Sequence, residues 1–432
     1  MKKAFKIAVC GIGYVGLPVA LLFVKKGYDV VGVDVDEDRV KKINRGFCPI
    51  KGREPGLGVL LKESLAKKSF RVTTNPEDYR DRDVMIVAVQ TPVESKTNEP
   101  KYEHLKKALE VIAPLMKKGV LVVIESTIAP TTMEKVVAIT LEKESGLHLN
   151  RDFMLANCPE RVMPGRLLYN LTHYDRLVGA FNFKAGKLVK KLYEEVLGVR
   201  VDITDPLTAE IVKSGENAYR DVQIAFANEM ALICEAYGAD VWQVRELLNK
   251  CPYRQMHSPG AGVGGHCLPK DSWLLISGAK DLIETKLIPL ARRINDFMPS
   301  HMFDLLKNAL AETGKDISEA KIVILGYTYD ANSDDTRNSP TASLVNILGQ
   351  NNVEFVIQDP YVKEYKISLK KVLKGAGAII LMTSHDQYKK IKLKQLKLLM
   401  VKSKPIIIDG RNCFDKIQAQ KLGFIYKGVG NI

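Results

Sequence analysis

The sequence predicts an α/β protein with two doubly wound lobes joined by a central helical domain that contains one long helix. Three observations carry this prediction. An apolar run near the N-terminus leads into glycines and then into a helical apolar pattern, residues 206–237 form one uninterrupted helical pattern, and a new alternation of strands and helices starts at residue 321. Alternation of this kind is typical of a parallel sheet with helices on both faces.

The first lobe is predicted from short apolar runs that are separated by helical patterns. Gly27 closes the first helical pattern, and Asp34 ends the second apolar run, so that a strand-helix-strand unit is complete within the first 34 residues. The expected strands are 5–10, 29–33, 84–89, 120–125 and 154–156, and the expected helices are 14–26, 103–116 and 131–143.

The central segment begins with Asp205-Pro206, an N-cap residue followed by proline at the first helical position. The helix that follows ends at Gly238 and would span about 48 Å, which is longer than one domain needs. We interpret it as a connector between two lobes. The helices expected in this segment are 206–237, 240–249 and about 281–312.

The third segment repeats the α/β alternation without a glycine fingerprint. Its expected strands are 321–326, 354–357, 378–381 and 405–408. At 432 residues the chain is long enough for several hydrophobic cores. The predicted domains are 1–204, 205–314 and 315–432.

Composition excludes several function classes. The hydrophobic fraction of 46% is ordinary, and the sequence contains neither an apolar run of membrane-spanning length nor a signal peptide, so a cytoplasmic location is expected. The net charge of +14 is scattered among acidic residues, which favours a solvated surface and an anionic small substrate over nucleic acid. The seven cysteines and seven histidines show neither disulfide nor metal-ligand spacing, so no metal is expected.

Gly11, Gly13 and Gly16 follow the first strand with the spacing that lets backbone amides approach a pyrophosphate at a helix N-terminus. Asp34 would accept hydrogen bonds from the ribose hydroxyls, which favours NAD, whereas Arg39 complicates that preference. The alternative is a purely structural turn. The same spacing at residues 260–265 lacks a preceding strand and is not interpreted as a dinucleotide site. Both lobes are expected to be Rossmann-like, and the first is expected to bind NAD.

Two groups of residues suggest the chemistry. Lys213 and Asn217 are four residues apart and share a helix face, where an ammonium and a carboxamide could hold an oxyanion. Cys267 lies in a glycine-rich loop, with Asp271 four residues later as a possible general base. The alternatives are a solvated surface pair and an inert buried cysteine.

These motifs resemble the NAD-dependent nucleotide-sugar 6-dehydrogenases, a family that includes UDP-glucose, GDP-mannose and UDP-N-acetylhexosamine dehydrogenases. The resemblance covers nearly the whole chain and rests on several segments in the family's order. These are Gly11 to Pro18, Glu54-Pro55-Gly56-Leu57, Gln90-Thr91-Pro92, Glu125-Ser126-Thr127, Cys158-Pro159-Glu160-Arg161, the Lys213/Asn217 helix, the segment 262–271, and Asp334 to Pro340.

The resemblance implies a four-electron oxidation that uses two NAD molecules in turn, in which Cys267 forms a thiohemiacetal and then a thioester. It also implies that Lys213 and Asn217 stabilise oxyanions, that Asp271 and Thr127 handle water, and that Glu160 assists proton transfer. The implied cofactor contacts are Gly11, Gly13, Tyr14, Val15, Gly16, Asp34, Arg39, Thr91 and Thr127. The implied substrate contacts are Glu160, Arg161, Lys213, Asn217, Arg254, His257, Gly264, His266, Asp335 and Arg337, with the third lobe holding the nucleotide.

His266 beside the cysteine resembles the N-acetylhexosamine branch, which implies UDP-N-acetyl-D-mannosamine as the substrate, with UDP-N-acetylglucosamine, UDP-glucose and GDP-mannose as alternatives. Tyr329-Asp330 departs from the Phe-Lys that many members carry. The resemblance also implies at least a dimer, because Arg254 corresponds to an arginine that reaches the neighbouring subunit's substrate. Two other hypotheses remain open: a two-electron β-hydroxyacid dehydrogenase and a non-catalytic NAD-binding protein.

Overall fold

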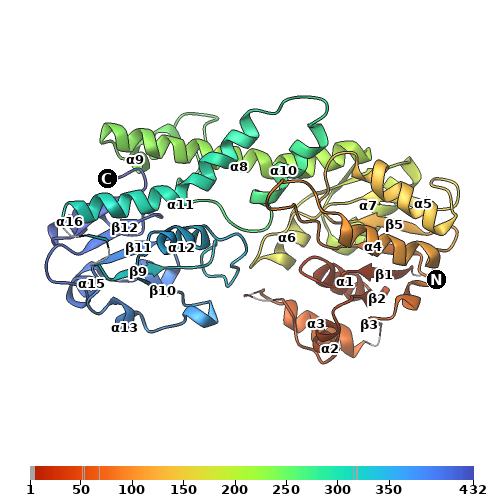
Figure 1. Ribbon diagram of the computed structural model, residues 1–432. Coiled ribbons are helices and arrows are strands. Elements are labelled where there is room, and N and C mark those ends of the chain that lie inside the picture. The colour runs from red at the N-terminus through yellow and green to blue at the C-terminus, as the bar shows by residue number, and fades with distance from the viewer. Residues whose placement is uncertain (1–4, 51, 53, 68, 315, 318–319) are drawn as a thin grey trace. The chain divides into compact units, whose positions relative to one another are not determined.

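The computed structural model describes residues 5–50, 52, 54–67, 69–314, 316–317 and 320–432 (Figure 1). The chain divides into two compact units. The first runs to Glu216 and includes Trp273–Glu284, and the second comprises Asn217–Ser272 and Thr285–Ile432. Each unit contains a Rossmann-like lobe, and a helical segment lies between the two lobes in sequence, so the expected fold class is confirmed. The three-domain division stays a prediction, and its boundary at residue 315 lies outside the described residues.

The first unit contains an eight-stranded sheet in the order β3-β2-β1-β4-β5-β6-β7-β8. All pairs are parallel except β6 with β7, which are antiparallel. This pair differs from the expected all-parallel sheet because the chain returns along β7 without crossing the sheet, and strand direction is not visible in a local apolar pattern. The strands are β1 (Lys6–Cys10), β2 (Asp29–Val33), β3 (Phe70–Thr73), β4 (Val84–Val87), β5 (Leu121–Ile124), β6 (Met154–Asn157), β7 (Arg176–Ala180) and β8 (Val201–Thr204).

Helices cover both faces of this sheet. Successive residues of β1 alternate between two cores: Ile7 and Val9 pack with α1, α3, α6 and α7, whereas Ala8 and Cys10 pack with α4 and α5. Full burial of both faces explains why the strands read as continuous apolar runs. The helices are α1 (Gly16–Lys25), α2 (Glu37–Asn44), α3 (Leu57–Ala66), α4 (Glu103–Ile112), α5 (Ile139–Ser145), α6 (Leu167–His173) and α7 (Phe183–Leu197), with a π-helical stretch over Met133–Ala138.

The expected helix over 131–143 differs from the structure at its start. Thr131 has a φ of 73°, a left-handed value that a right-handed helix does not contain, so the helical segment begins after it. The next residues form the π-helical stretch before α5 begins at Ile139. A left-handed threonine leaves no trace in the apolar pattern, which is why the sequence did not reveal this boundary.

The helix α8 (Pro206–Tyr237) has the predicted bounds. It is followed by α9 (Val241–Leu248), α10 (Leu268–Ala279) and α11 (Leu287–Ala311). The prediction missed α10 and began the next helix too early, at 281. The glycines before Cys267 suggested a loop here, but the helix begins directly after them, and its second position tolerates Pro269 because first-turn amides have no intrahelical acceptor.

The second unit contains a five-stranded parallel sheet in the order β10-β9-β11-β12-β13. Residues of β9 alternate between a core shared with α8, α11 and α12 and a core shared with α13, α15 and α16. The strands are β9 (Ile322–Leu325), β10 (Phe355–Gln358), β11 (Ala378–Leu381), β12 (Ile406–Asp409) and β13 (Ile425–Gly428), and the helices are α12 (Pro340–Gln350), α13 (Leu369–Leu373), α14 (Asp386–Lys389), α15 (Leu393–Leu399) and α16 (Lys416–Lys421). Of the helices that the structure describes, none is long and apolar enough to cross a membrane.

Candidate active site

The glycine loop follows β1 at the carboxyl edge of the first sheet and leads directly into α1. A Cβ atom on Gly16 would lie 1.9 Å from the carbonyl oxygen of Gly11, and Gly11 itself has a φ of 84°. Only glycine is compatible with either position. Gly13 has open space where a side chain would stand, so its backbone is accessible at the helix N-terminus. This cradle fits the pyrophosphate of a dinucleotide, with Tyr14 and Val15 completing the turn.

Asp34 lies at the end of β2, beside the glycine loop. Its buried carboxylate accepts the amide N–H of Ile12 at 2.8 Å and the guanidinium of Arg39 at 2.9 Å. The ion pair shows that Arg39 already neutralises this carboxylate, so a ribose hydroxyl must compete with Arg39 for the oxygens of Asp34. Asp34, which favours NAD, and Arg39, which complicates that preference, are therefore in direct contact.

Glu54 connects the glycine loop to a second segment. Its carboxylate accepts the hydroxyl of Tyr14 at 2.7 Å, the amide of Gly165 at 2.6 Å and the amide of Leu167 at 3.1 Å. The latter two amides lie at the start of α6, shortly after Glu160 and Arg161. Glu54 was noted in the sequence only as part of a motif, and the structure gives it a cross-linking role within the first unit.

Thr91, Thr127 and Glu160 follow three neighbouring strands, β4, β5 and β6, at the same sheet edge. The hydroxyl of Thr91 donates to the carbonyl oxygen of Thr127 at 2.6 Å. Glu160 is largely buried, and its carboxylate accepts the amide N–H of Val162. The edge therefore brings Thr91 and Thr127 into contact, as the spacing of parallel strands requires.

A buried ion pair lies beneath this edge. Glu125, at the end of β5, accepts Arg176 at 2.8 Å and the hydroxyl of Tyr193 at 2.6 Å, and all three side chains are at most 2% exposed. Arg176 also donates to the carbonyl oxygen of Cys158 at 2.6 Å. Burial raises the pKa of the Cys158 thiol to about 12, so the thiol is neutral within the cluster. The cluster holds the backbone immediately before Thr127 and Glu160.

Lys213 lies on α8 and is 5% exposed. Arg161 forms an ion pair with Glu216 on the same helix at 2.5 Å and donates to the carbonyl oxygen of Asp175, also at 2.5 Å. Arg161 therefore fastens the segment after β6 to α8. Lysine is rarely buried, and burial of the Lys213 ammonium on α8 is typical of a functional role.

Cys267 stands at the start of α10, a position that the sequence did not reveal. Its carbonyl oxygen accepts the amides of Lys270 at 3.1 Å and Asp271 at 2.8 Å, so Cys267 is the N-cap residue of the helix. The partial positive charge at a helix N-terminus favours a negative thiolate over a neutral thiol. The predicted nucleophile thus has a local electrostatic reason to be reactive.

Asp271, in the first turn of α10, is fully buried. It accepts the carboxamide N–H of Asn217 at 2.6 Å and forms an ion pair with Lys270 at 2.6 Å. The structure therefore brings together Asn217 of α8 and the acid that follows the cysteine, which are 54 residues apart in sequence.

His266 and Gly264 lie in the loop before Cys267. A backbone hydrogen bond joins this loop to the segment after β9. The amide of Gly265 donates to the carbonyl oxygen of Arg337 at 2.9 Å. Burial, together with Lys270 and Arg337, lowers the pKa of His266 to about 4, so its imidazole is neutral at neutral pH. Arg337 forms an ion pair with Asp335 at 2.5 Å. Two predicted nucleotide contacts are therefore paired with each other and joined to the cysteine loop.

Tyr329 is a residue that sequence reasoning did not place. Its ring would lie 2.9 Å from a Cβ atom on Gly265, and its side chain also leaves no room for a Cβ atom on Gly264. Burial raises the pKa of the Tyr329 hydroxyl, and the charge of Cys267 acts in the same direction. The position where many family members carry phenylalanine thus forms a wall of the cysteine loop.

Arg411, after β12, packs on the first of the second set of spaced glycines. Its Nη1 would lie 2.6 Å from a Cβ atom on Gly260, and its guanidinium donates to the carbonyl oxygens of Met382 at 2.9 Å and Gly262 at 3.3 Å. A Cβ atom on Gly262 would meet Pro340 and Pro299, and one on Gly265 would meet Tyr329. The three glycines therefore pack against other segments of the second unit, and among the described residues no strand leads into them, although a dinucleotide site requires one.

Arg254 and His257 lie in the segment after α9. Arg254 is exposed and donates to the carbonyl oxygen of Pro252 at 2.9 Å, whereas His257 bonds Gln223 of α8 at 3.1 Å. Neither of these contacts involves the cysteine loop. Within the described part of the chain, no group of three or more His, Cys, Asp and Glu side chains is arranged to hold a metal ion.

Comparison with known proteins places this geometry in a family. Three successive segments match the NAD binding, central and UDP binding domains of the UDP-glucose/GDP-mannose dehydrogenase family, over residues 5–197, 207–297 and 323–416. The UDP-N-acetyl-D-mannosamine dehydrogenase of Pyrococcus horikoshii is 43% identical over 98% of this chain and 99% of its own length. The protein of the same name from Methanococcus maripaludis is 37% identical over 99% and 97%.

Solved structures of enzymes with the same names are similar to this chain over nearly its full length. The structure of the Pyrococcus horikoshii enzyme covers 99% of both chains with a TM-score of 0.93. A UDP-N-acetyl-mannosamine dehydrogenase from Staphylococcus aureus is 33% identical, covers 99% of both chains and has a TM-score of 0.85. With a glycine cradle that fits NAD in the first lobe and matches to all three family domains, the chain belongs to the UDP-glucose/GDP-mannose dehydrogenase family and is an NAD-dependent nucleotide-sugar dehydrogenase.

Proposed function

We propose that this enzyme oxidises the C6 hydroxyl of UDP-N-acetyl-D-mannosamine to the carboxylate in two steps, through a thioester on Cys267. The observation that carries the proposal is Cys267 at the N-terminus of α10, next to the buried Asp271–Asn217 contact. A dehydrogenase that stopped at the aldehyde would need neither an activated thiol nor a buried carboxylate beside it.

Each residue of the site has a proposed role. Lys213 and Asn217 stabilise the oxyanion that forms at C6 in each step. The thiolate of Cys267 adds to the aldehyde carbon, and the resulting thiohemiacetal loses a hydride to become a thioester. Water, positioned by Thr127 and Asp271, displaces the sulfur, and Glu160 assists the proton transfers.

The cofactor site and the substrate site supply the remaining parts. The glycine loop and Asp34 would hold NAD, which would supply the hydride acceptor for each of the two oxidations at C6. Overall, one alcohol, two NAD⁺ and one water give one carboxylate, two NADH and three protons. We assign the nucleotide end of the substrate to the segment around Asp335 and Arg337, with Arg161, Gly264, His266 and His257 as further contacts.

The N-acetylated sugar is supported by the names of the relatives that are 43% and 37% identical over nearly the full chain. His266 directly before the nucleophile is consistent with this branch. UDP-N-acetylglucosamine and UDP-glucose are the alternatives. The first differs from the proposed substrate in stereochemistry at C2, and the second differs there in stereochemistry and also lacks the acetamido group.

A substrate panel tests the proposal. Purified enzyme with NAD and each of several UDP- and GDP-sugars is expected to release two NADH per sugar consumed, with the highest kcat/KM for UDP-N-acetyl-D-mannosamine. The measurement is NADH absorbance together with chromatography of the uronate. One NADH per sugar would instead indicate a two-electron dehydrogenase, and preference for another sugar would reassign the substrate.

We also propose a dimer built on α8. Four large apolar side chains of this helix are 45–86% exposed; the first three recur at heptad spacing and the fourth follows four residues later, which places them in one stripe. They are Tyr219, Phe226, Ile233 and Tyr237. Such a stripe favours pairing with a second copy, which would also allow Arg254 to reach the partner's substrate.

Sedimentation tests the dimer. The wild-type enzyme is expected to sediment as a dimer or a larger even assembly, and Phe226→Asp with Ile233→Asp is expected to give monomers that have lost most activity, because the stripe can no longer be buried. Glu229→Ala, an exposed change on the same helix, is the control. A fully active wild-type monomer would contradict this proposal.

A further inference from the structure

The loop between β5 and the π-helical stretch carries Thr127 at its beginning and Met133 at its end. Thr91 holds the first end, since its hydroxyl donates to the carbonyl oxygen of Thr127 at 2.6 Å. The middle of the loop is held by Tyr102, whose hydroxyl accepts the amide of Ala129 at 3.0 Å. The far end has a different kind of anchor, a buried carboxylate on α8.

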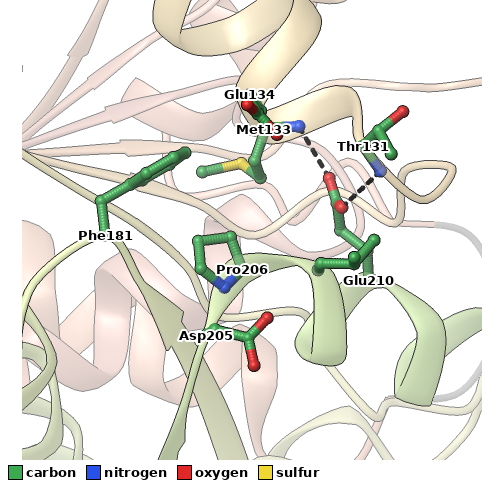
Figure 2. A pocket seen from close by; sticks show the side chains of 8 residues that line it. Thr131, Met133, Glu134, Phe181, Asp205, Pro206 and Glu210 are labelled. Carbon is green, nitrogen blue, oxygen red and sulfur yellow. Dashed lines mark hydrogen bonds between the residues drawn. The ribbon is translucent and has the colours of Figure 1, made fainter.

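That carboxylate belongs to Glu210, which is 1% exposed. Figure 2 shows its two oxygens directed at two backbone amides of the loop, the N–H of Thr131 and the N–H of Met133, each at 2.7 Å. Both oxygens are therefore used, one for each amide. The carboxylate lies at the edge of a cavity of about 200 Å³ that Phe181 and Pro206 also line.

The backbone that Glu210 holds is strained. Thr131 has a φ of 73°, and a β-branched residue adopts this left-handed conformation only when surrounding contacts enforce it. Two charge-assisted hydrogen bonds on either side of Thr132 supply such enforcement. Without these two hydrogen bonds, Thr131 is expected to relax to a negative φ.

Glu210 also lies one helical turn before Lys213 on α8. Its own carbonyl oxygen accepts the hydroxyl of Ser214 at 2.7 Å. One side chain thus joins the helix that carries the proposed oxyanion-binding lysine to the loop that carries the proposed water-positioning threonine.

We propose that Glu210 is a positioning residue that sets Thr127 for thioester hydrolysis by clamping its loop to α8 through the amides of Thr131 and Met133. The role assigned to Thr127 rests on the proposed function. The clamp requires an ionised carboxylate, because a protonated acid or an amide presents one acceptor and one donor, and the donor cannot satisfy a backbone N–H.

The surroundings of Glu210 make this ionisation sensitive to pH. Burial raises the pKa of Glu210 to about 7, and the charge of Glu134 on the adjacent π-helical stretch acts in the same direction. The other ionisable groups near it are the carboxylate of Asp205, which lines the same cavity, and the hydroxyl of Tyr102 across the loop. The clamp is therefore half formed near pH 7, is complete only at clearly higher pH, and is lost as the pH falls further.

The test compares Glu210→Gln with wild-type enzyme and Glu210→Asp. Glu210→Gln is expected to lower kcat by about 10- to 100-fold while the KM of the sugar changes little, since a misplaced catalytic group affects turnover more than binding. Because hydrolysis is the slowed step, a rapid burst of two NADH per active site is expected before slow turnover, with the acyl-enzyme visible by intact mass spectrometry. The acidic limb of kcat near pH 7 is expected to disappear.

Glu134→Gln is the matched control, because Glu134 lines the same cavity but is exposed. It is expected to keep wild-type kcat at pH values well above 7, and to move the acidic limb to lower pH, because the charge of Glu134 raises the pKa of Glu210. Should Glu210→Gln fail to fold, Glu210→Asp, which keeps the charge but is one methylene shorter, is expected to show the same burst. Wild-type kcat and an unchanged pH profile in both Glu210 variants would overturn the inference.

Hydrogen exchange separates this inference from the proposed function. The amides of Thr131 and Met133 are expected to exchange faster in Glu210→Gln than in wild type, whatever the enzyme oxidises. Unchanged exchange at both amides would refute the clamp, whereas a wild-type enzyme that makes no uronate would refute only the proposed reaction.

Discussion

Cys267→Ala is expected to abolish uronate formation, lowering kcat by about 10⁴-fold or more, as is typical when a covalent nucleophile is removed. Without sulfur the aldehyde cannot form the thiohemiacetal from which the second hydride leaves. Cys267→Ser is expected to stall near the first oxidation level, because an alkoxide is far harder to form than a thiolate at neutral pH. Chromatography of the products together with NADH absorbance gives the measurement.

Cys251→Ala provides the control for this prediction, since Cys251 is exposed and lies outside the cysteine loop. Its kcat is expected to remain within about twofold of the wild-type value. Full turnover by Cys267→Ala, with two NADH per sugar, would refute the covalent assignment and leave direct oxidation of a hydrated aldehyde as the mechanism.

Arg176→Met is expected to lower the free energy of unfolding of the first unit by about 3–5 kcal/mol, because it leaves the carboxylate of Glu125 buried without its cation. The Glu125–Arg176 ion pair is 2.8 Å long, with side chains that are 0% and 2% exposed. Loss of the pair also frees the backbone before Thr127 and at Cys158, so kcat should fall together with stability.

Urea titration can measure this loss in the first unit. The chain has two tryptophans, and Trp273 belongs to the first unit whereas Trp242 belongs to the second, so fluorescence in a Trp242→Phe background reports the first. Arg200→Met is the control, because its ion pair with Asp202 is 69% and 57% exposed and should change stability by less than about 1 kcal/mol. An equal loss of unfolding free energy in Arg176→Met and Arg200→Met would show that burial does not make the Arg176–Glu125 ion pair more important for stability than an exposed pair.

Much of the cofactor site could be predicted from the sequence. Gly11 and Gly16 lie close together in one tight turn, and the strand and helix that flank this turn have local apolar patterns. The helix 206–237 was predicted with its observed bounds because Asp205-Pro206 and Gly238 mark its ends through backbone chemistry that needs no distant partner.

The surroundings of the nucleophile were less visible. Cys267 and Asp271 were selected, but the sequence suggested one loop where the structure begins α10. The helix begins only after the glycines, at Leu268, and a helix N-terminus favours a thiolate over a neutral thiol. Tyr329, which packs on the glycines of the same loop, follows a different strand, and only its departure from the family pattern drew attention to it.

By itself the sequence determined the two α/β lobes, the long helix, the glycine cradle and the residue types of the chemistry, because each of these is encoded over a few neighbouring positions. Only the tertiary structure decided which buried charges meet. Glu125 and Arg176 are 51 residues apart, and Glu210 lies 77 residues from the amide of Met133. A buried carboxylate must find its partner through the packing of whole elements, and no local pattern records that choice.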